Sequence, residues 1–193
     1  MAIKYSYTPT AAVKSEIKNS IKMLTDIPNK DFKTVYDATV LAVSKGGDLR
    51  SLSEALLSLG MDSLTKRRVA NICLFLNRRS KVIIDNERML SLGITEAIWR
   101  HSGAPCEPDS AWINGPSDDP PPSRPTKQAV NHKSADNRVY KIREGLLIDG
   151  GPTWPGRAEG CRCYHKPIIP ALSSFDGYRQ AKSNETIGSG CDG

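Results

Sequence analysis

The sequence predicts an α+β protein, with an N-terminal helical region that includes a long helix, followed by a small β-rich, Cys/His-containing C-terminal module and a flexible tail. Three observations predict this class. Apolar residues recur at helical spacing through the first hundred residues, prolines and glycines crowd the chain after Trp99, and short β-forming runs follow. The expected boundaries are a helical region at 1–100, a Pro-rich loop or arm at 101–130, a β-rich module at 131–170 and a flexible tail at 171–193.

Three helices are expected before residue 60. Thr10 is a good N-cap for the first, whose apolar residues recur every three or four positions before Pro28 ends it. A second helix covers about residues 31–44 and ends at a Gly-Gly pair. Asp48 is a good cap for the third, whose leucines form one apolar stripe closed by Gly60.

The longest helix is expected from Asp62 to Gly93, because its apolar residues keep close to one helical face. At roughly 1.5 Å per residue it would be about 45 Å long. That length exceeds the usual globular helix, so a break near Ser80 is the alternative.

The chain after Trp99 has a different character. Prolines between residues 102 and 125 exclude a helix and predict a long loop or an inserted arm. Short extended stretches are expected at 138–142 and 146–148, with a turn at 149–151.

Net charge is +6, and the basic excess is concentrated in residues 61–100, which hold eight Lys and Arg against four Asp and Glu. A concentrated basic excess suits contact with phosphates or with an acidic partner, and the alternative is a solvated helix face. The candidate contact residues are Lys66, Arg67, Arg68, Arg78, Arg79 and Lys81.

The chain contains no run of roughly 18 apolar residues, and its start lacks the apolar core of a secretory signal. We therefore expect no membrane association and a cytoplasmic location. Five cysteines, an odd number in a chain that is not exported, indicate reduced thiols or metal ligands rather than a disulfide framework.

The sequence Cys161-Arg162-Cys163 is the most specific local feature for metal binding. Structural zinc takes four nitrogen or sulfur ligands, and the candidate set is Cys106, His132, Cys161 and Cys163, with His165 and His101 as alternates. One structural Zn²⁺ would help a module that has few large apolar residues. The alternative is that these cysteines are small buried apolar residues.

A catalytic reading pairs Cys161 or Cys163, as nucleophile, with His132 or His165, as base. Nothing in the sequence supplies an orienting third group. We therefore expect no catalytic residues and no enzyme activity, and a cysteine-dependent hydrolase is kept only as an alternative.

Several short sequence segments, taken in their order along the chain, resemble those of a known family. The stretch Leu92-Gly-Ile-Thr-Glu-Ala-Ile-Trp99-Arg-His-Ser-Gly103 is followed by His132, by Asp136-Asn137, by an aromatic strand with Tyr140, by Trp154-Pro155-Gly156 and by Cys161-Arg162-Cys163. Their order and approximate spacing resemble those of phage Mu F-like head-morphogenesis proteins, over about residues 62–170. Ala129 stands where the family often has Arg, Asn137 stands where it usually has Gly, and the insertion from Cys106 to Pro125 is longer than expected.

The resemblance implies a structural minor head protein of a tailed bacteriophage, present in the virion and, during assembly, in the host cytoplasm. It would act with portal protein and with capsid or scaffold proteins in head (procapsid) morphogenesis, and in packaging or ejection of double-stranded DNA. The basic residues of the long helix would then contact the portal or DNA. The alternative is a stand-alone protein that binds DNA without sequence preference.

Overall fold

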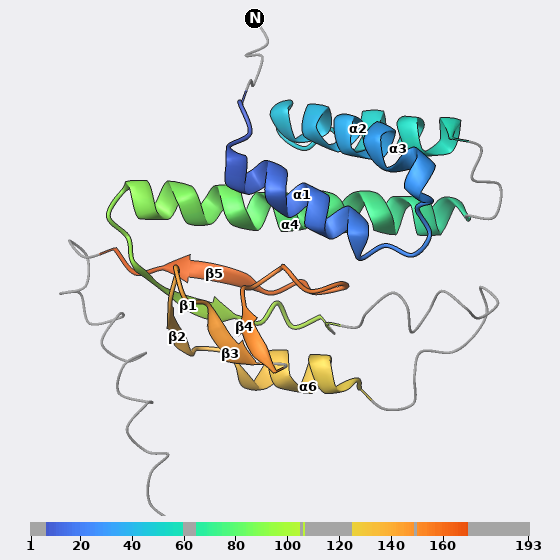
Figure 1. Ribbon diagram of the computed structural model, residues 1–193. Coiled ribbons are helices and arrows are strands. Elements are labelled where there is room, and N and C mark those ends of the chain that lie inside the picture. Colours follow the sequence, from blue (N-terminus) through green and yellow to red (C-terminus); the bar gives the residue numbers. More distant parts are fainter. Residues whose placement is uncertain (1–6, 60–64, 105, 107–124, 149, 170–193) are drawn as a thin grey trace, which may run out of the picture. The chain divides into compact units, whose positions relative to one another are not determined.

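The computed structural model describes residues 7–59, 65–104, 106, 125–148 and 150–169, and mixes helices with short strands, which confirms the predicted α+β class (Figure 1). The chain divides into two compact units, residues 1–85 and 86–193. The predicted tail at 171–193 and most of the Pro-rich segment lie outside the described residues. In the part of the chain that is described, no helix is both long and apolar enough to cross a bilayer.

The first unit is helical. Its elements are α1 (Ala11–Lys22), the short 3-10 helix η1 (Asn29–Asp31), α2 (Phe32–Ser44), α3 (Leu49–Ser58) and most of α4 (Lys66–Ser91). Both predicted caps are confirmed. The Thr10 hydroxyl accepts a hydrogen bond from the N–H of Val13 at 3.2 Å, and Asp48 accepts one from the N–H of Ser51 at 3.1 Å.

Helix α4 is continuous over 26 residues, so the alternative of a break near Ser80 is wrong. The Ser80 hydroxyl is buried and donates to the carbonyl of Leu76 at 2.8 Å, which satisfies it within the helix. Gly93, at φ +75°, ends the helix: its N–H donates to Leu90, and the N–H of Ile94 donates to Met89. This is the double hydrogen bond by which a left-handed glycine closes a helix.

The core of the first unit combines the apolar stripes of its four α-helices. Val13 and Ile17 of α1, Leu56 of α3, and Ile72 and Leu76 of α4 are all fully buried. Burial of these side chains at helical spacing is what holds the helices together.

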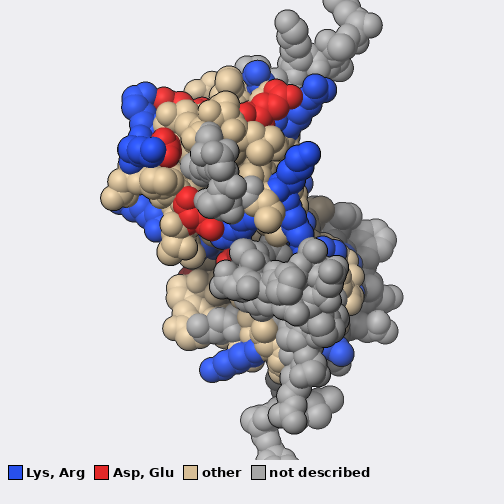
Figure 2. Space-filling model, turned by 90° about the vertical axis from the view of Figure 1, so that its right-hand side faces the viewer, with Lys and Arg blue, Asp and Glu red and all other residues tan. Residues whose placement is uncertain are grey.

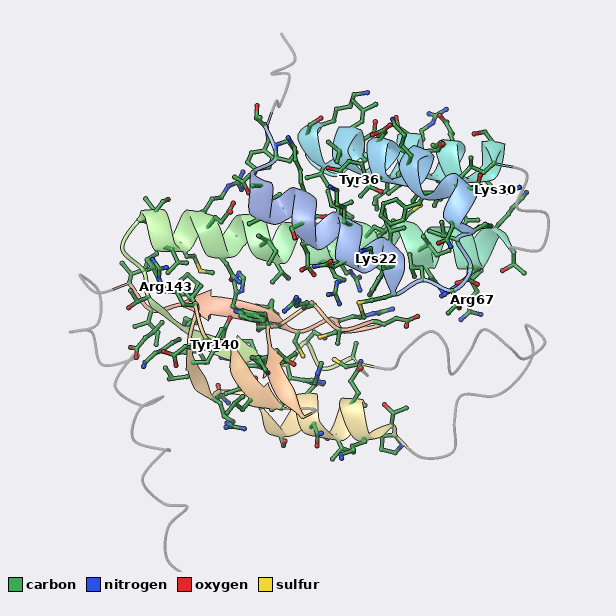
Figure 3. All side chains as sticks on the ribbon, in the orientation of Figure 1. Lys22, Lys30, Tyr36, Arg67, Tyr140 and Arg143 are labelled. Atoms are coloured by element: carbon green, nitrogen blue, oxygen red, sulfur yellow. The ribbon has the colours of Figure 1, made fainter. Side chains whose placement is uncertain are left out.

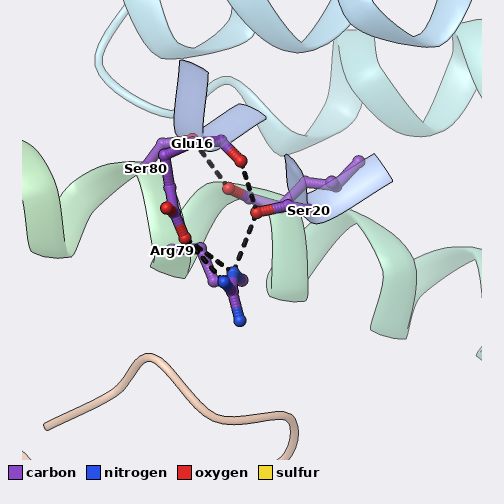
Figure 4. Close-up of polar contacts among 5 residues, drawn as sticks. Glu16, Ser20, Arg79 and Ser80 are labelled. Carbon is purple, nitrogen blue, oxygen red and sulfur yellow. Dashed lines mark hydrogen bonds and ion pairs between the residues drawn. The ribbon is translucent and has the colours of Figure 1, made fainter. Parts of the chain in front are cut away.

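A polar network lies inside this apolar core (Figure 4). Arg79 of α4 is buried, and its guanidinium lies 2.7 Å from a carboxylate oxygen of Glu16 and donates to the Ser20 hydroxyl at 2.8 Å. Since two buried opposite charges are tolerable only when each satisfies the other, this network specifies how α1 pairs with α4.

The second unit contains a three-stranded antiparallel sheet in the order β2-β1-β5, with β1 (Glu96–Arg100) between β2 (Val139–Lys141) and β5 (Tyr164–Pro167). The strands β3 (Leu146–Ile148) and β4 (Gly151–Thr153) form a separate hairpin. The two stretches expected to be extended, 138–142 and 146–148, thus contain β2 and β3.

Two predicted boundaries are wrong. The helical region does not reach residue 100, because Gly93 ends α4 and the following Ile-Trp sequence of Glu96–Arg100 forms β1. Residues 127–134 form the helix α6 (Lys127–Ser134), which crosses the expected boundary at 130–131. Thr126 caps α6 by accepting from the N–H of Ala129 at 3.2 Å, immediately after Pro125.

The core of the second unit surrounds Trp99 of β1, which is fully buried. Tyr140 of β2 meets it edge-on, with ring centroids 6.4 Å apart. Asn137 adopts a left-handed backbone at φ 67° and donates its N–H to the carbonyl of Trp99 at 2.8 Å. This turn aligns β2 beside β1.

Candidate metal centre

The structure brings together the four residues proposed from the sequence as metal ligands. Cys106, His132, Cys161 and Cys163 are all buried, and their candidate ligand atoms lie within 4.8 Å of one another. Within the described residues, this is the cluster of His, Cys, Asp and Glu that could hold a metal ion. Three thiols and one imidazole form a ligand set of the kind used by structural metal sites.

The ligands come from three separate segments. Cys106 follows β1, His132 lies in the last turn of α6, and Cys161 and Cys163 directly precede β5. The chain turns immediately before the Cys-Arg-Cys sequence, whose two cysteines both belong to the cluster. Gly160 has φ +67°, and the N–H of Cys161 donates to the carbonyl of Ala158 at 3.1 Å.

The sulfur atoms are close without being bonded. The Sγ of Cys106 lies 3.8 Å from that of Cys161 and 3.4 Å from that of Cys163. A disulfide would need about 2.05 Å. Sulfurs bound tetrahedrally at about 2.3 Å from one zinc ion would be about 3.8 Å apart, so these separations suit a shared metal.

Hydrogen bonds between the sulfurs shift the pKa values of the thiols in opposite directions. Those to Cys161 and then Cys163 lower the pKa of Cys106 far below that of a free thiol. Those to Cys106 and then Cys161, together with burial, raise the pKa of Cys163. Burial opposes a charge on His132, but its interactions with Cys106 and Cys161 outweigh burial and raise its pKa to about 10. A thiolate next to an imidazolium is a charge pair whose proton a metal cation can replace.

Backbone and side-chain groups around the ligands fix their positions. The N–H of Gly156 donates to the Sγ of Cys161 at 3.3 Å. Gln128, one turn before His132 on α6, donates from one amide nitrogen to the carbonyl of Cys106 at 2.8 Å and to that of Glu159 at 2.7 Å. That single amide therefore links the two segments that carry the cysteines to the helix that carries the histidine.

Sequence reasoning missed Gln128, because α6 itself was not predicted. Its one local signal is the spacing of four residues from His132, which places both side chains on the same face of a helix. The signal becomes readable only once the helix is known.

The two alternate ligands do not belong to the cluster. His165 is paired in register with Trp99, as part of β5. His101 uses Nδ1 to accept the N–H of Gly103 at 3.1 Å. Cys73 is buried in the helical unit, where burial raises its pKa to about 11, and Cys191 lies outside the described residues.

The six predicted contact residues of α4 are not equivalent. Lys66, Arg67 and Lys81 are exposed, whereas Arg78 is only partly so. Arg68 is half-buried, and its Nε donates to Asp26 at 3.1 Å. The inclusion of Arg79 is wrong, because its charge is buried against Glu16. Figure 2 shows basic side chains interspersed with acidic ones on one face of the molecule, so ion pairing decides which cations remain available.

Comparisons of the chain with models of protein families, with curated proteins and with solved structures find no match. The buried set of three cysteines and one histidine is the feature of the described residues with the most specific chemistry. Its closed arrangement of four ligands, inside a core, suits holding an ion rather than exposing it to a substrate.

Proposed function

We propose that Cys106, His132, Cys161 and Cys163 bind one Zn²⁺ ion that staples the second unit together. The observation that carries this proposal is the convergence of four buried ligand atoms within 4.8 Å. Zinc is favoured because it accepts mixed thiolate and imidazole ligands in tetrahedral geometry, and structural sites use four protein ligands. Carboxylate-preferring ions such as Mg²⁺ and Ca²⁺ would bind poorly to three sulfurs.

The role we propose for the ion is structural. It would tie together segments around residues 106, 132 and 161–163, which are far apart in the sequence. A metal that closes such long loops stabilises the folded state, because the chain gains less conformational entropy when it unfolds. The strands of this unit are each three to five residues long, which is short for a sheet that has to be stable by itself.

Elemental analysis of protein purified without added metal tests the zinc site. We expect close to one equivalent of zinc in the unmodified protein and less than about half an equivalent after Cys161→Ser or Cys163→Ser. Cys73→Ser is the matched control, since Cys73 is buried in the other unit, and it should keep its zinc. An unmodified protein without zinc would contradict the proposal, as would equal zinc content in all three variants.

We further infer that the chain is a structural assembly protein, of the kind that the resemblance to phage Mu F-like head-morphogenesis proteins implies. The support is that residues carrying the resemblance belong to one framework: Trp99, Tyr140, Cys161 and Cys163 share one buried core, in which His132 packs on Trp99. Asn137, which stands at the family's usual glycine position, has the left-handed backbone that glycine favours.

An assembly role fits the site better than turnover does. A four-ligand zinc site leaves no open position for water or substrate, and the Sγ-bearing residues are at most 5% exposed. The same burial argues against a cysteine-dependent hydrolase, whose nucleophile has to reach its substrate.

Co-expression tests the assembly role. The chain should co-purify with a phage portal protein when the two are expressed together, and it should be present in isolated virions. An absence of association in the first experiment together with an absence from virions in the second would overturn this inference, whereas the zinc content would stand as a separate result.

A further inference from the structure

Helix α1 presents a regular line of lysines on its outer face. Lys14, Lys18 and Lys22 follow one another every four residues, and all three are exposed. On an α-helix this spacing places successive side chains on one face, about 6 Å apart along the axis. We call these three residues the α1 lysine row.

The opposite face of α1 packs into the core of the helical unit. Val13, Ile17 and Ile21 are buried there, and so is Glu16, which is the acid closest to the row in the sequence. Because the Glu16 carboxylate is bound to Arg79, it does not neutralise the row.

Most other acidic side chains of this unit are also engaged, in ion pairs or as a helix cap. Asp26 binds Arg68, Asp37 binds Lys33 and Glu54 binds Arg50. Asp48 is the N-cap of α3. None of the three lysines of the row forms an ion pair with a described residue. The Lys18 ammonium instead lies over the ring of Tyr36, 5.5 Å from its centroid.

The residues beside the row are small and polar. Ser15 and Asn19 are exposed next to it, also four residues apart, and can donate hydrogen bonds to phosphate oxygens. Protein–protein interfaces are instead enriched in aromatic residues and Arg, and are depleted in Lys. The composition of this face therefore favours a phosphate backbone over an acidic protein surface.

Arg67 extends the positive charge of the α1 lysine row beyond Lys22, at the C-terminal end of α1. Figure 3 shows Lys22 and Arg67 at the same end of the helical unit, where α1 ends and α4 begins. Arg67 and its neighbour Lys66 are both exposed. Neither has an ion pair among the residues that the structure describes.

We propose that the α1 lysine row binds the phosphate backbone of double-stranded DNA without reading its sequence. The row spans about 12 Å along the helix axis, and a duplex carries one charge per roughly 1.7 Å of its own axis, so each lysine has phosphates within reach. This surface is distinct from the metal centre, and it is centred on α1 rather than on the α4 face that charge alone had indicated; only Lys66 and Arg67, at the start of α4, extend it. The inference depends neither on zinc nor on the portal.

Fluorescence anisotropy with a labelled random-sequence duplex of 30 base pairs, measured from 50 to 200 mM salt, tests the proposal. The probe variant is the triple substitution Lys14→Gln, Lys18→Gln and Lys22→Gln. The matched control, Lys33→Gln, Arg50→Gln and Lys141→Gln, removes the same three charges from exposed cations that are already ion-paired. The triple Lys→Arg variant of the row keeps the charge and should bind like the unmodified protein.

Each phosphate contact contributes about 0.9 to the slope of log affinity against log salt concentration. We expect the Gln variant of the row to lower that slope by roughly 2 to 3, and the paired-cation control to leave it nearly unchanged. Equal losses in the two triple variants would overturn the proposal, as would an unmodified protein that does not bind DNA at 50 mM salt. Competition by polyglutamate as strong as that by DNA of equal charge concentration would also overturn it, in favour of an acidic protein partner.

Discussion

The imidazole of His132 lies edge-on to the indole of Trp99, with ring centroids 5.1 Å apart and an interplanar angle of 75°. Both side chains are fully buried. Trp99 therefore forms the wall against which the ring of a candidate metal ligand is oriented, and it joins the central strand of the sheet to the candidate metal centre.

Replacing Trp99 should affect stability and metal binding together. Trp99→Ala removes a large buried side chain and should lower the free energy of unfolding by about 3–5 kcal/mol. Trp99→Phe keeps an aromatic wall and should cost less. Urea unfolding of the zinc-loaded protein measures the stability of both variants. An Ala variant as stable as the unmodified protein would rule out this role for Trp99.

Gln128→Glu should weaken metal binding without touching a ligand. A carboxylate cannot donate to the carbonyls of Cys106 and Glu159, so the segments that carry the cysteines lose their link to α6. Loss of such an outer hydrogen bond typically weakens metal affinity about 10–100-fold. Release of zinc to a chromogenic chelator measures the effect. Lys127→Gln is the control, because it makes the same change in charge at an exposed position of α6, and comparable release rates in both variants would count against the proposed link.

Zinc affinity should rise with pH between 6 and 8. Without metal, His132 has a pKa of about 10 and Cys163 a raised pKa, so both hold protons in this range. Zinc needs a neutral imidazole and thiolates, so binding releases these protons, and a higher pH favours binding. Calorimetric titration in two buffers of different ionisation enthalpy should show that zinc binding releases protons. A pH-independent affinity would exclude ligation by these two residues.

The buried ion pair of the helical unit should be intolerant of single changes. Arg79→Ala leaves the Glu16 carboxylate buried without its cation and should cost about 3–5 kcal/mol, measured by loss of helical circular dichroism in urea. The double variant Arg79→Met with Glu16→Leu should recover much of this loss. Arg50→Ala, which breaks an exposed pair, should change stability by less than about 1 kcal/mol. If Arg79→Ala were as mild as Arg50→Ala, the pair would not be structural.

The turn at Asn137 should accept glycine but not a β-branched residue. At φ 67°, Asn137→Gly should be neutral or slightly stabilising, whereas Asn137→Val should lower stability by about 1–2 kcal/mol. Thermal unfolding of the zinc-loaded protein compares the two variants, and equal melting temperatures would show that this backbone conformation is not required.

The sequence predicted best where the signal is local. A threonine or aspartate just before an apolar stripe defines a helix start by itself, so the caps at Thr10 and Asp48 could be predicted. The four metal-ligand candidates could also be chosen, because few residue types bind metal and this chain has few of them.

The remaining features depend on contacts that no local pattern contains. The environment of Arg79 is set by Glu16, which lies more than sixty residues earlier. Residues 96–100 form a strand because they pair with β2 and β5, which follow much later in the chain. Helix α6 is too short for its periodicity to stand out beside a Pro-rich segment. Charge and periodicity on one helix do not reveal which side another helix will cover.

The order of the strands bears on how the second unit is made in the cell. β1 is translated first yet lies in the middle of its sheet, so both of its edges stay unpaired until β2 and finally β5 have been synthesised. At about 5–20 residues per second, the ribosome needs roughly 3–11 seconds to travel from Cys106 to Cys163. During that interval the nascent chain displays an apolar strand with open edges, which is the form most prone to pair with a neighbouring chain. Completion of this sheet is therefore a late, single event, governed by the emergence of β5.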